Sequence, residues 1–311
     1  MNTTEVVQVL RELVRAESIK KDEPLSSYTF TRTGGCADIF VMPQSYEDIG
    51  EVVKYANEHN IPITLLGNGS NVIVRDGGIR GITIHMGRLK QIYLKDDHTL
   101  VAESGARIID ASRFALKHTL TGLEFACGIP GTVGGALYMN AGAYGGEVSD
   151  VLQSAIVVTR DGEVKSIPAS ELELDYRHSA VAEKGYIVVE ATFVLKTGTH
   201  EEIKSIMDDL TYKRESKQPL EFPSCGSVFK RPPGYFAGKL IQDSDLQGTQ
   251  IGGVQVSKKH AGFMVNIDKG TASDYIALIK HVQQTVFNKF GVELETEVKI
   301  IGEEEPGQLT T

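Results

Sequence analysis

The chain has 311 residues, a hydrophobic content of 41%, a charged content of 23% and a formal net charge of -9 at pH 7. This length exceeds what one hydrophobic core usually supports, so we expect two or three domains. The acidic balance and the lack of a basic cluster argue against a nucleic-acid partner. The sequence shows neither a basic and apolar leader nor a run of about twenty apolar residues, so we expect a cytoplasmic protein with no membrane partner.

Cysteine and histidine usage gives no sign of a metal centre. Cys36, Cys127 and Cys225 are far apart and never spaced as CxxC, which argues against disulfides and against a thiolate site. The eight histidines are dispersed without a ligand spacing. The motifs GxSxG, HExxH and GxxxxGK[ST] do not occur either. We therefore expect packing or loop cysteines and no metal.

The first part of the chain predicts alternating helices and strands. Residues 4–15 place valine and leucine side chains on one face, which indicates an amphipathic helix. A strand is expected at 38–42, and the helix after it is expected to begin at a capping pair formed by Ser45 and Asp48. A further strand is expected at 61–66, directly before a loop rich in glycine and asparagine.

That loop is Gly67-Asn68-Gly69-Ser70-Asn71, and the β-branched run 72–74 follows it. The spacing of Gly67 and Gly69 resembles the start of a dinucleotide fingerprint, but that motif must open a helix. Because a strand follows here instead, a Rossmann fold is disfavoured. The backbone N–H groups and the Ser70 and Asn71 side chains can still bind a diphosphate. A simple hairpin turn is the alternative.

The most distinctive stretch runs from Gly122 to Gly146 and contains eight glycines in 25 residues, with no Lys, Arg or Asp. Each glycine costs about 0.5–1 kcal/mol relative to alanine inside a helix or strand, so we expect a loop rather than a packed element. Glycines let the backbone approach a flat ring or a diphosphate closely, and successive N–H groups can bind an anion. We expect a cradle for a large nucleotide cofactor. A loop that only makes turns is the alternative, which the second glycine loop at 67–71 makes less favoured.

Short strands and helices of an α+β chain are expected around these loops. Asp161-Gly162 is a hairpin signal, so the strands on either side are expected to be antiparallel. The helix over 108–118 is expected to carry Ile109, Phe114 and Ala115 inward. The expected strands of this region lie at 82–85, 91–94, 100–103, 154–159, 164–167 and 186–195.

A helix over 200–215 is expected to connect this region to a different domain, because the proline-rich residues 216–236 follow it. Its apolar face is expected to hold Ile203, Ile206, Met207 and Leu210. The elements expected beyond it are strands at 253–256, 263–267 and 297–301 and a helix over 273–290 that ends at Gly291.

Three polar side chains stand in unusual settings. Arg177 follows a tyrosine just before an apolar strand, where a guanidinium can hold a carboxylate through two hydrogen bonds; a surface ion pair is the alternative. Ser227 follows a glycine, where a turn can present its hydroxyl to a cleft; a turn or capping serine is the alternative. Glu297 begins an apolar strand, where desolvation would raise the pKa of an unpaired carboxyl; an exposed strand end is the alternative.

Five motifs, taken together and in order, resemble the UDP-N-acetylenolpyruvoylglucosamine reductase family. They cover nearly the whole chain, and the combination is specific although each motif alone is weak. The motifs are LGNGSNV at 66–72, CGIPGTVGGALYMNAGAYG at 127–145, DYRHS at 175–179, SCGSVFKRP at 224–232 and LETEVKIIG at 294–302.

The resemblance implies an α+β fold with a two-subdomain FAD-binding region of the vanillyl-alcohol-oxidase type and a C-terminal α+β substrate domain. It implies subdomains at 1–88 and 89–199, a substrate domain at 200–302 and a flexible tail at 303–311. The implied reaction belongs to peptidoglycan precursor synthesis. NADPH reduces non-covalent FAD, and hydride from flavin N5 then reaches C3 of UDP-N-acetylglucosamine enolpyruvate, which gives UDP-N-acetylmuramate.

The resemblance also assigns residues. Arg177 and Glu297 would polarise the substrate carboxylate and stabilise an enol-like intermediate, and Ser227 would give a proton to C2. The implied substrate contacts are Tyr176, Lys217 and Arg231, with Arg231 standing where some members have a diphosphate-binding asparagine. The implied FAD contacts are Gly67, Asn68, Gly69, Ser70, Asn71, Val72, Gly128, Ile129, Pro130, Gly131, Thr132, Gly134, Gly135, Asn140, Gly142, Ala143, Tyr144, Gly146 and Arg214.

The sequence differs from some family members in one respect, and two other functions stay open as alternatives. Only residues 180–185 separate the DYRHS motif from the next strand, so the chain resembles the shorter type of member, which lacks the insertion that places a tyrosine over the substrate. A sugar or lactone oxidase on the same scaffold is the alternative enzyme, but such enzymes often attach FAD through a histidine, and none stands near Gly34-Gly35. A non-catalytic module that binds a nucleotide sugar is the alternative outside the enzymes.

Overall fold

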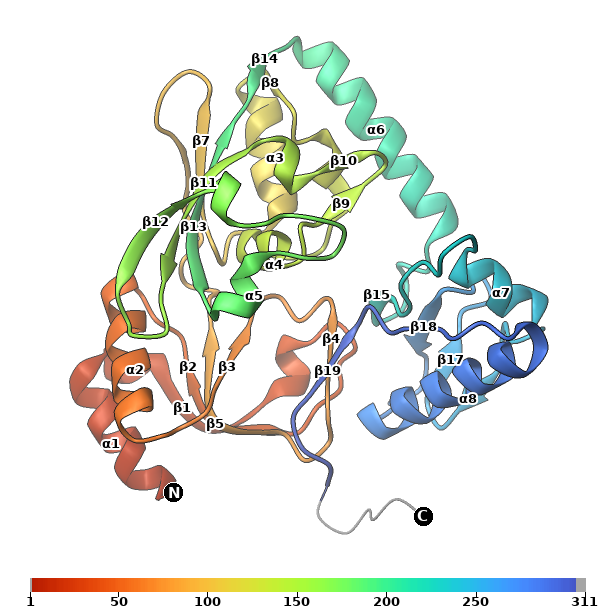
Figure 1. Ribbon diagram of the computed structural model, residues 1–311, viewed down its shortest axis with the longest axis horizontal. Helices are drawn as coiled ribbons and strands as arrows, with labels where there is room; N and C mark the ends of the chain where they lie inside the picture. Colours follow the sequence, from red (N-terminus) through yellow and green to blue (C-terminus); the bar gives the residue numbers. More distant parts are fainter. Residues whose placement is uncertain (1, 306–311) are drawn as a thin grey trace. The chain divides into compact units, whose positions relative to one another are not determined.

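The computed structural model describes residues 2–305 (Figure 1). The chain forms two compact units, and each is assembled from segments that are not contiguous in sequence. Unit 1 comprises the residues up to Lys21, Asp38–Asn68 and Gly81–Lys213; unit 2 comprises Asp22–Ala37, Gly69–Arg80 and the described residues from Arg214 onward. The expected flexible tail falls largely outside the described residues, although Glu303 is anchored by backbone hydrogen bonds to Gly77 and Gly78.

The first layer of unit 1 is a four-stranded sheet of order β1-β2-β5-β3, and the parallel pairing of β3 with β5 sets Ile63 opposite Ile82. Helices α1 and α2 bury Leu10 and Val52 against this sheet. The expected capping pair is confirmed, because Ser45 accepts from the Asp48 N–H at 3.1 Å. The elements are α1 (Thr3–Leu13), β1 (Ile19–Pro24), β2 (Cys36–Val41), α2 (Tyr46–Glu58), β3 (Ile63–Leu66) and β5 (Ile79–His85).

The second layer of unit 1 is a five-stranded antiparallel sheet of order β12-β11-β13-β7-β6, which confirms the expected antiparallel strands around Asp161-Gly162. Its core includes Phe193 and Val157, with helices α3 and α4 packed on it. The elements are β6 (Ile92–Leu94), β7 (Thr99–Glu103), α3 (Ile108–Lys117), β8 (Leu120–Thr121), α4 (Val133–Tyr138), β9 (Gly142–Ala143), β10 (Gly146–Glu147), β11 (Leu152–Val158), β12 (Val164–Pro168), α5 (Ala180–Lys184), β13 (Ile187–Val194) and β14 (Lys196–Thr197).

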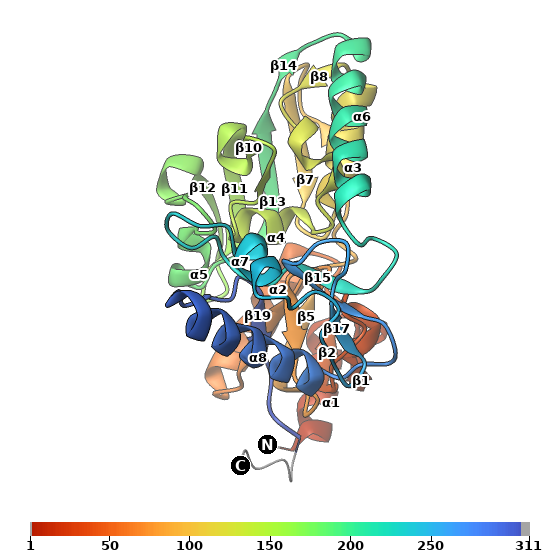
Figure 2. The same ribbon diagram turned by 90° about the vertical axis from the view of Figure 1, so that its right-hand side faces the viewer.

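Helix α6 (His200–Lys217) lies along α3, as Figure 2 shows, and buries Ile203 and Met207 against Cys127. The expectation for its apolar face was wrong at Ile206, whose side chain is 48% exposed. In α3 the expected inward positions are confirmed for Ala115, which is buried, and for Phe114, which is half-buried and packs on the core. The expectation was wrong at Ile109, because the neighbouring Ile108 takes the buried position, together with Ala111 and Ser112.

Unit 2 holds a four-stranded sheet of order β15-β18-β17-β16 with helices α7 and α8 packed on it. Helix α8 begins at a capping box formed by Thr271 and Asp274 and ends at Gly291, whose φ of 67° confirms the expected left-handed stop. A separate parallel pair joins β4 to β19. The elements are β4 (Val72–Val74), β15 (Ser224–Ser227), α7 (Ala237–Asp243), β16 (Gln250–Ile251), β17 (Val254–Val256), β18 (Phe263–Asn266), α8 (Ala272–Phe290) and β19 (Lys299–Ile301).

The stretch from Gly122 to Gly146 is not the open loop that its glycines suggested. It contains a 3₁₀ helix at Glu124–Gly128, the short helix α4 and the β9-β10 hairpin. Glycine is required inside α4 because a Cβ on Gly134 would lie 2.0 Å from the Ser104 hydroxyl oxygen. The expectation failed because these glycines allow the backbone to pack closely on neighbouring side chains as well as to turn.

All three cysteines are free; Cys127 and Cys225 are buried and Cys36 is exposed. The expectation of packing or loop cysteines without disulfides is therefore confirmed.

Candidate functional site

The loop between β3 and β4 is shaped for close approach of a ligand to the backbone. Gly69 has a φ of 64°, and a Cβ there would lie 2.2 Å from the Tyr28 carbonyl oxygen, so only glycine fits. Among residues 2–305, no protein acceptor lies within hydrogen-bonding reach of the N–H groups of Gly69, Ser70 and Asn71. Three successive half-buried or buried donors without partners suit an anion such as a diphosphate.

The two glycine-rich segments meet within unit 1. The Asn68 side-chain amide donates to the Pro130 carbonyl oxygen at 2.6 Å. A Cβ on Gly67 would lie 2.9 Å from the Thr132 hydroxyl oxygen, so the Gly67 backbone packs closely on the Thr132 side chain. The hairpin alternative for residues 67–71 is excluded, because β3 pairs with β5 and β4 pairs with β19 rather than with each other.

The segment before α4 presents further unpaired donors. Thr132 caps α4 by accepting from the Gly135 N–H at 3.2 Å, and the N–H groups of Val133 and Gly134 bond to the backbone at Ala106 and Ser104. In the part of the chain that the structure describes, the N–H groups of Gly131 and Thr132 find no protein acceptor. This pattern again leaves donors for a ligand, as the sequence predicted for a nucleotide cradle.

The β9-β10 hairpin turns at Tyr144 and Gly145, whose φ values of 56° and 90° are those of a tight two-residue turn. The Tyr144 side chain is 51% exposed. A Cβ on Gly146 would lie 2.9 Å from the Phe125 Cβ, so the hairpin packs tightly on the 3₁₀ helix. These close contacts argue against the alternative in which the glycines of this stretch only make turns.

Asn140, which the sequence assigned to the cofactor, has a buried side chain bonded within the protein. Its Nδ2 donates to Glu147 Oε1 at 3.0 Å and to the Asp175 carbonyl oxygen at 3.3 Å. Its Oδ1 accepts from the Ser149 N–H at 3.0 Å. Both Nδ2 hydrogens therefore have protein partners, and the side chain connects the glycine-rich stretch to the segment that carries Arg177.

Arg177 lies in a tight turn. The backbones of Asp175 and His178 exchange two hydrogen bonds, of 3.0 and 3.2 Å, and the Asp175 carboxylate accepts from the Tyr176 N–H at 2.7 Å. Arg177 itself has a φ of 55°, and its guanidinium carbon lies 5.4 Å from the centre of the Tyr176 ring. The Tyr176 side chain is exposed and the Arg177 side chain is half-buried, so this turn presents an aromatic ring with a cation beside it.

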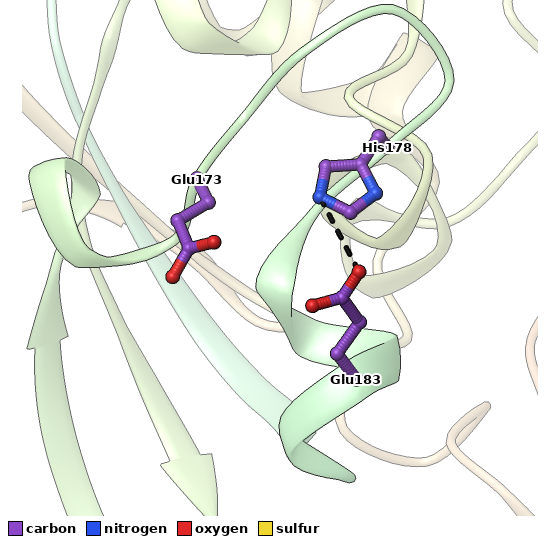
Figure 3. Close-up of side chains that lie close together, drawn as sticks. All are labelled: Glu173, His178 and Glu183. Atoms are coloured by element: carbon purple, nitrogen blue, oxygen red, sulfur yellow. Dashed lines mark ion pairs between the residues drawn. The ribbon is translucent and has the colours of Figure 1, made fainter.

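Close to this turn, Glu173, His178 and Glu183 form a cluster whose candidate ligand atoms all lie within 4.8 Å of one another (Figure 3). The three residues lie five positions apart, a spacing that matches none of the metal motifs sought in the sequence. Its members already have charged partners, since Lys184 Nζ lies 3.3 Å from Glu173 and His178 Nε2 lies 3.8 Å from Glu183. Acidic groups on an exposed surface are common without a metal, and we assign none here.

Unit 2 brings Ser227 and Glu297 to adjacent segments. Ser227 is exposed at the end of β15, where an irregularity in the pairing with β18 spans Cys225 and Gly226. The Glu297 N–H donates to the Val228 carbonyl oxygen at 2.8 Å. Glu297 does not begin a strand as expected, because β19 starts at Lys299. The residues before β19 instead run alongside the segment after β15, through the Phe229–Thr296 bridge.

Asn71 joins this arrangement from the first glycine loop. Its side-chain amide lies 3.5 Å from the Glu297 carbonyl oxygen, and its own carbonyl accepts from the Lys299 N–H at 3.1 Å. The loop that carries the unpaired N–H donors is therefore hydrogen-bonded to the segment that carries Glu297, and that segment is bonded in turn to the residue after Ser227. All of these residues belong to unit 2. Sequence separation of more than 220 residues hid this proximity.

The remaining expected contacts fall in unit 2. Arg214 and Lys217 belong to the last turn of α6. The Arg231 guanidinium carbon lies 4.0 Å from the centre of the Phe236 ring, and its Nε donates to the Tyr235 carbonyl oxygen at 3.4 Å. The arginine thus lies folded against its own loop, which fixes where its charge is held.

Burial changes the pKa of two groups near these segments. Burial raises the pKa of the Cys225 thiol to about 12, so this residue next to the Ser227 turn stays a neutral thiol and not a nucleophile. Burial also lowers the pKa of His85 to about 4. The His85 ring stacks on the Phe40 ring, with the ring centroids 5.5 Å apart.

Comparison with known proteins places these features in a family. The sequence model of the UDP-N-acetylenolpyruvoylglucosamine reductase C-terminal domain matches residues 218–301, and that of an FAD-binding domain matches residues 37–167. A UDP-N-acetylenolpyruvoylglucosamine reductase of Oceanobacillus iheyensis is 62% identical over 95% of this chain and 96% of its own length. A reductase 2 of that name from Bacillus cereus is 62% identical over 98% of this chain and 99% of its own length.

The crystal structure of a UDP-N-acetylenolpyruvylglucosamine reductase from Thermus caldophilus superposes with a TM-score of 0.79 at 31% identity, covering 91% of this chain and 98% of that one. The expected fold class, an α+β chain with an FAD-binding region followed by a C-terminal α+β domain, is confirmed. Within residues 2–305, every helix is too short or too polar to cross a membrane.

Proposed function

Because the chain belongs to the UDP-N-acetylenolpyruvoylglucosamine reductase family, we propose that it reduces UDP-N-acetylglucosamine enolpyruvate to UDP-N-acetylmuramate, with NADPH as reductant and FAD as bound cofactor. The observation that carries the proposal is the pair of glycine-rich segments with unpaired backbone donors, held together by the Asn68–Pro130 hydrogen bond. These segments coincide with the motifs that define the resemblance, and the near full-length relatives supply the substrate class.

The residues present fit FAD. The loop at 69–71 offers donors for a diphosphate, and the segment at 131–132 offers two more. Gly67, Gly69 and Gly134 each stand where a Cβ would meet a protein atom closer than 3.0 Å, so glycine lets these segments pack closely on their neighbours. When bound, FAD supplies the hydride chemistry, taking hydride from NADPH and passing it to C3 of the enolpyruvyl group. The other expected cofactor contacts stay predictions.

Side chains of the protein would then stabilise the negative charge on the substrate carboxylate and supply the proton to C2. The Arg177 guanidinium would hold the enolpyruvyl carboxylate, where negative charge builds as hydride arrives. The Ser227 hydroxyl, exposed after Gly226, would give its proton to C2, since the developing carbanion is basic enough to take it. The half-buried Glu297 would act with Arg177 on the carboxyl group of the substrate.

Three substrate contacts complete the proposal. Lys217 would contact the nucleotide part, and Arg231 would bind the diphosphate with a guanidinium positioned by Phe236. Tyr176 would contact the substrate beside Arg177. The division at residues 88, 199 and 302 and a location in the cytoplasm also stay predictions, as does the absence of nucleic-acid and membrane partners.

Product analysis tests the activity. The purified protein is incubated with NADPH and UDP-N-acetylglucosamine enolpyruvate, and the nucleotide sugar is examined by mass spectrometry. We expect a gain of two hydrogens that needs both NADPH and bound FAD, and that an Arg177→Ala variant nearly abolishes. An unchanged substrate alongside oxidation of a simple sugar or lactone would favour the alternative enzyme on the same scaffold.

A further inference from the structure

Two hydrogen bonds tie the turn that carries Arg177 to the glycine-rich stretch of unit 1. The Asn140 side-chain amide donates to the Asp175 carbonyl oxygen at 3.3 Å, two residues before Arg177. The Ser179 hydroxyl donates to the Tyr138 carbonyl oxygen at 2.8 Å, two residues after it. Asn140 and Ser179 are each only 1% exposed, so the donor side chain of each bond is buried.

The turn is paired within itself, because the backbones of Asp175 and His178 exchange hydrogen bonds of 3.0 and 3.2 Å. Arg177 has a left-handed φ of 55°, a conformation that costs a non-glycine residue on the order of 1–3 kcal/mol unless its surroundings impose it. The two bonds that flank the turn connect the backbone on either side of Arg177 to the glycine-rich stretch, and so help to place this residue.

Asn140 is in turn fixed by the cofactor-side segment. Its Nδ2 donates to Glu147 Oε1 at 3.0 Å in β10, and its Oδ1 accepts from the Ser149 N–H at 3.0 Å. The Glu147 carboxylate also accepts from the Ser149 hydroxyl at 2.5 Å. One amide thus spans from the β9-β10 hairpin to the backbone of the Arg177 turn, so a shift of the hairpin is transmitted to the turn.

We propose that Asn140 is a positioning residue, which sets the Arg177 guanidinium in register with the glycine-rich cofactor segment rather than contacting the cofactor through its side chain. The inference rests on the proposed function, because it concerns the step in which Arg177 meets the substrate. Its physical basis is orientation: a displacement of about 1 Å at a charge-stabilising group can cost roughly 100-fold in rate. Removing the bond should therefore slow only the step that uses Arg177.

The experiment compares half-reactions of the FAD-loaded enzyme in a stopped-flow instrument. Bleaching by NADPH and reoxidation by UDP-N-acetylglucosamine enolpyruvate are measured for the wild type, Asn140→Ala, Arg177→Ala and the double variant. We expect Asn140→Ala to leave bleaching within about twofold and to slow reoxidation roughly 10- to 100-fold. In the Arg177→Ala variant, the additional Asn140→Ala substitution should slow reoxidation no further, because the guanidinium that Asn140 positions is already absent.

Ser149→Ala is the matched control, since it removes another hydrogen bond to Glu147 without touching the turn, and it should keep both rates. Should Asn140→Ala fail to fold, the same cycle with Ser179→Ala, which cuts the other bond that flanks the turn, tests the positioning of Arg177 instead. Retained FAD absorbance and thermal unfolding near the wild-type temperature accompany each variant.

Three results would overturn the inference. Asn140→Ala could reoxidise at the wild-type rate, could slow Arg177→Ala by the same factor as the wild type, or could weaken FAD binding and both half-reactions together. A wild type that is not reoxidised by the enolpyruvyl substrate refutes the proposed function and with it this inference. An Arg177→Ala variant that is reoxidised normally refutes the role of Arg177, and with it the positioning by Asn140.

Discussion

The backbone N–H of Glu297 donates a 2.8 Å hydrogen bond to the carbonyl oxygen of Val228, the residue that follows Ser227. This bond fixes two polar residues from motifs about 70 positions apart on neighbouring segments of unit 2. Backbone pairing holds them, so the side chains of Ser227 and Glu297 do not need to contact each other to be held in place. Their substitution should consequently change chemistry more than stability.

Replacing Ser227 with alanine should separate the two half-reactions. NADPH should still bleach the flavin, because that step needs no proton at C2, whereas turnover of the enolpyruvyl substrate should fall by about 10²–10⁴-fold. Ser224→Ala, at the other end of β15, is the control and should retain turnover. Loss of both half-reactions in Ser227→Ala, with FAD still bound, would contradict the assigned role.

Gly69 and Gly226 make a matched pair for testing the first glycine loop. Both have left-handed φ values, 64° and 76°, so alanine at either site costs about 1–2 kcal/mol of backbone strain. Only at Gly69 would a Cβ also lie 2.2 Å from a backbone carbonyl oxygen, that of Tyr28, whereas the space at Gly226 is open. Chemical denaturation should show Gly69→Ala to be the more destabilised variant; equal losses would mean that the close approach to Tyr28 is not required.

His85 should make the protein less stable in acid. Burial lowers its pKa to about 4 from 6.5, so between these values the unfolded chain binds a proton that the folded chain does not. Stability should fall as the pH drops from 6.5 toward 4, by at most about 3 kcal/mol from this residue. Denaturation of His85→Gln between pH 7 and 5 should show a shallower decline than the wild type, whereas His200→Gln, at an exposed position, should follow the wild type.

The three thiols should differ sharply in reactivity. Cys36 is exposed, Cys127 is buried with its thiol 3.6 Å from the Met207 carbonyl oxygen, and burial raises the pKa of Cys225 to about 12. Because the thiolate is the reactive form, a thiol reagent at pH 8 should modify one cysteine quickly in the native protein and all three after unfolding. Cys36→Ser should remove the fast phase; fast labelling that persists would show that a buried thiol becomes accessible.

Glycine content and motif order were enough to predict the family and its FAD-binding region, because the five motifs occur together and in order along the chain. The internal structure of the Gly122–Gly146 stretch was not predictable, since Gly134 is required by its contact with Ser104, which lies on a different segment. Asn140 was assigned to the cofactor from its place in the motif at 127–145, and nothing local in the sequence indicates that its amide also reaches Asp175.

Long-range pairing accounts for the other misses. Glu297 was expected at the start of a strand because an apolar run follows it, but its backbone pairs with the segment after β15 rather than in the β4-β19 ladder. The discontinuous make-up of the two units has the same origin, because residues 22–37 and 69–80 join unit 2 through contacts that sequence order does not reveal.

A flavin that passes electrons from NADPH to an enolpyruvyl nucleotide sugar should show both steps in an anaerobic visible spectrum of the purified, FAD-loaded protein. We predict that the flavin band bleaches when NADPH is added and returns when UDP-N-acetylglucosamine enolpyruvate follows. A band that bleaches but is not restored would contradict the substrate assignment. A protein that stays colourless after incubation with FAD would contradict the cofactor site as well.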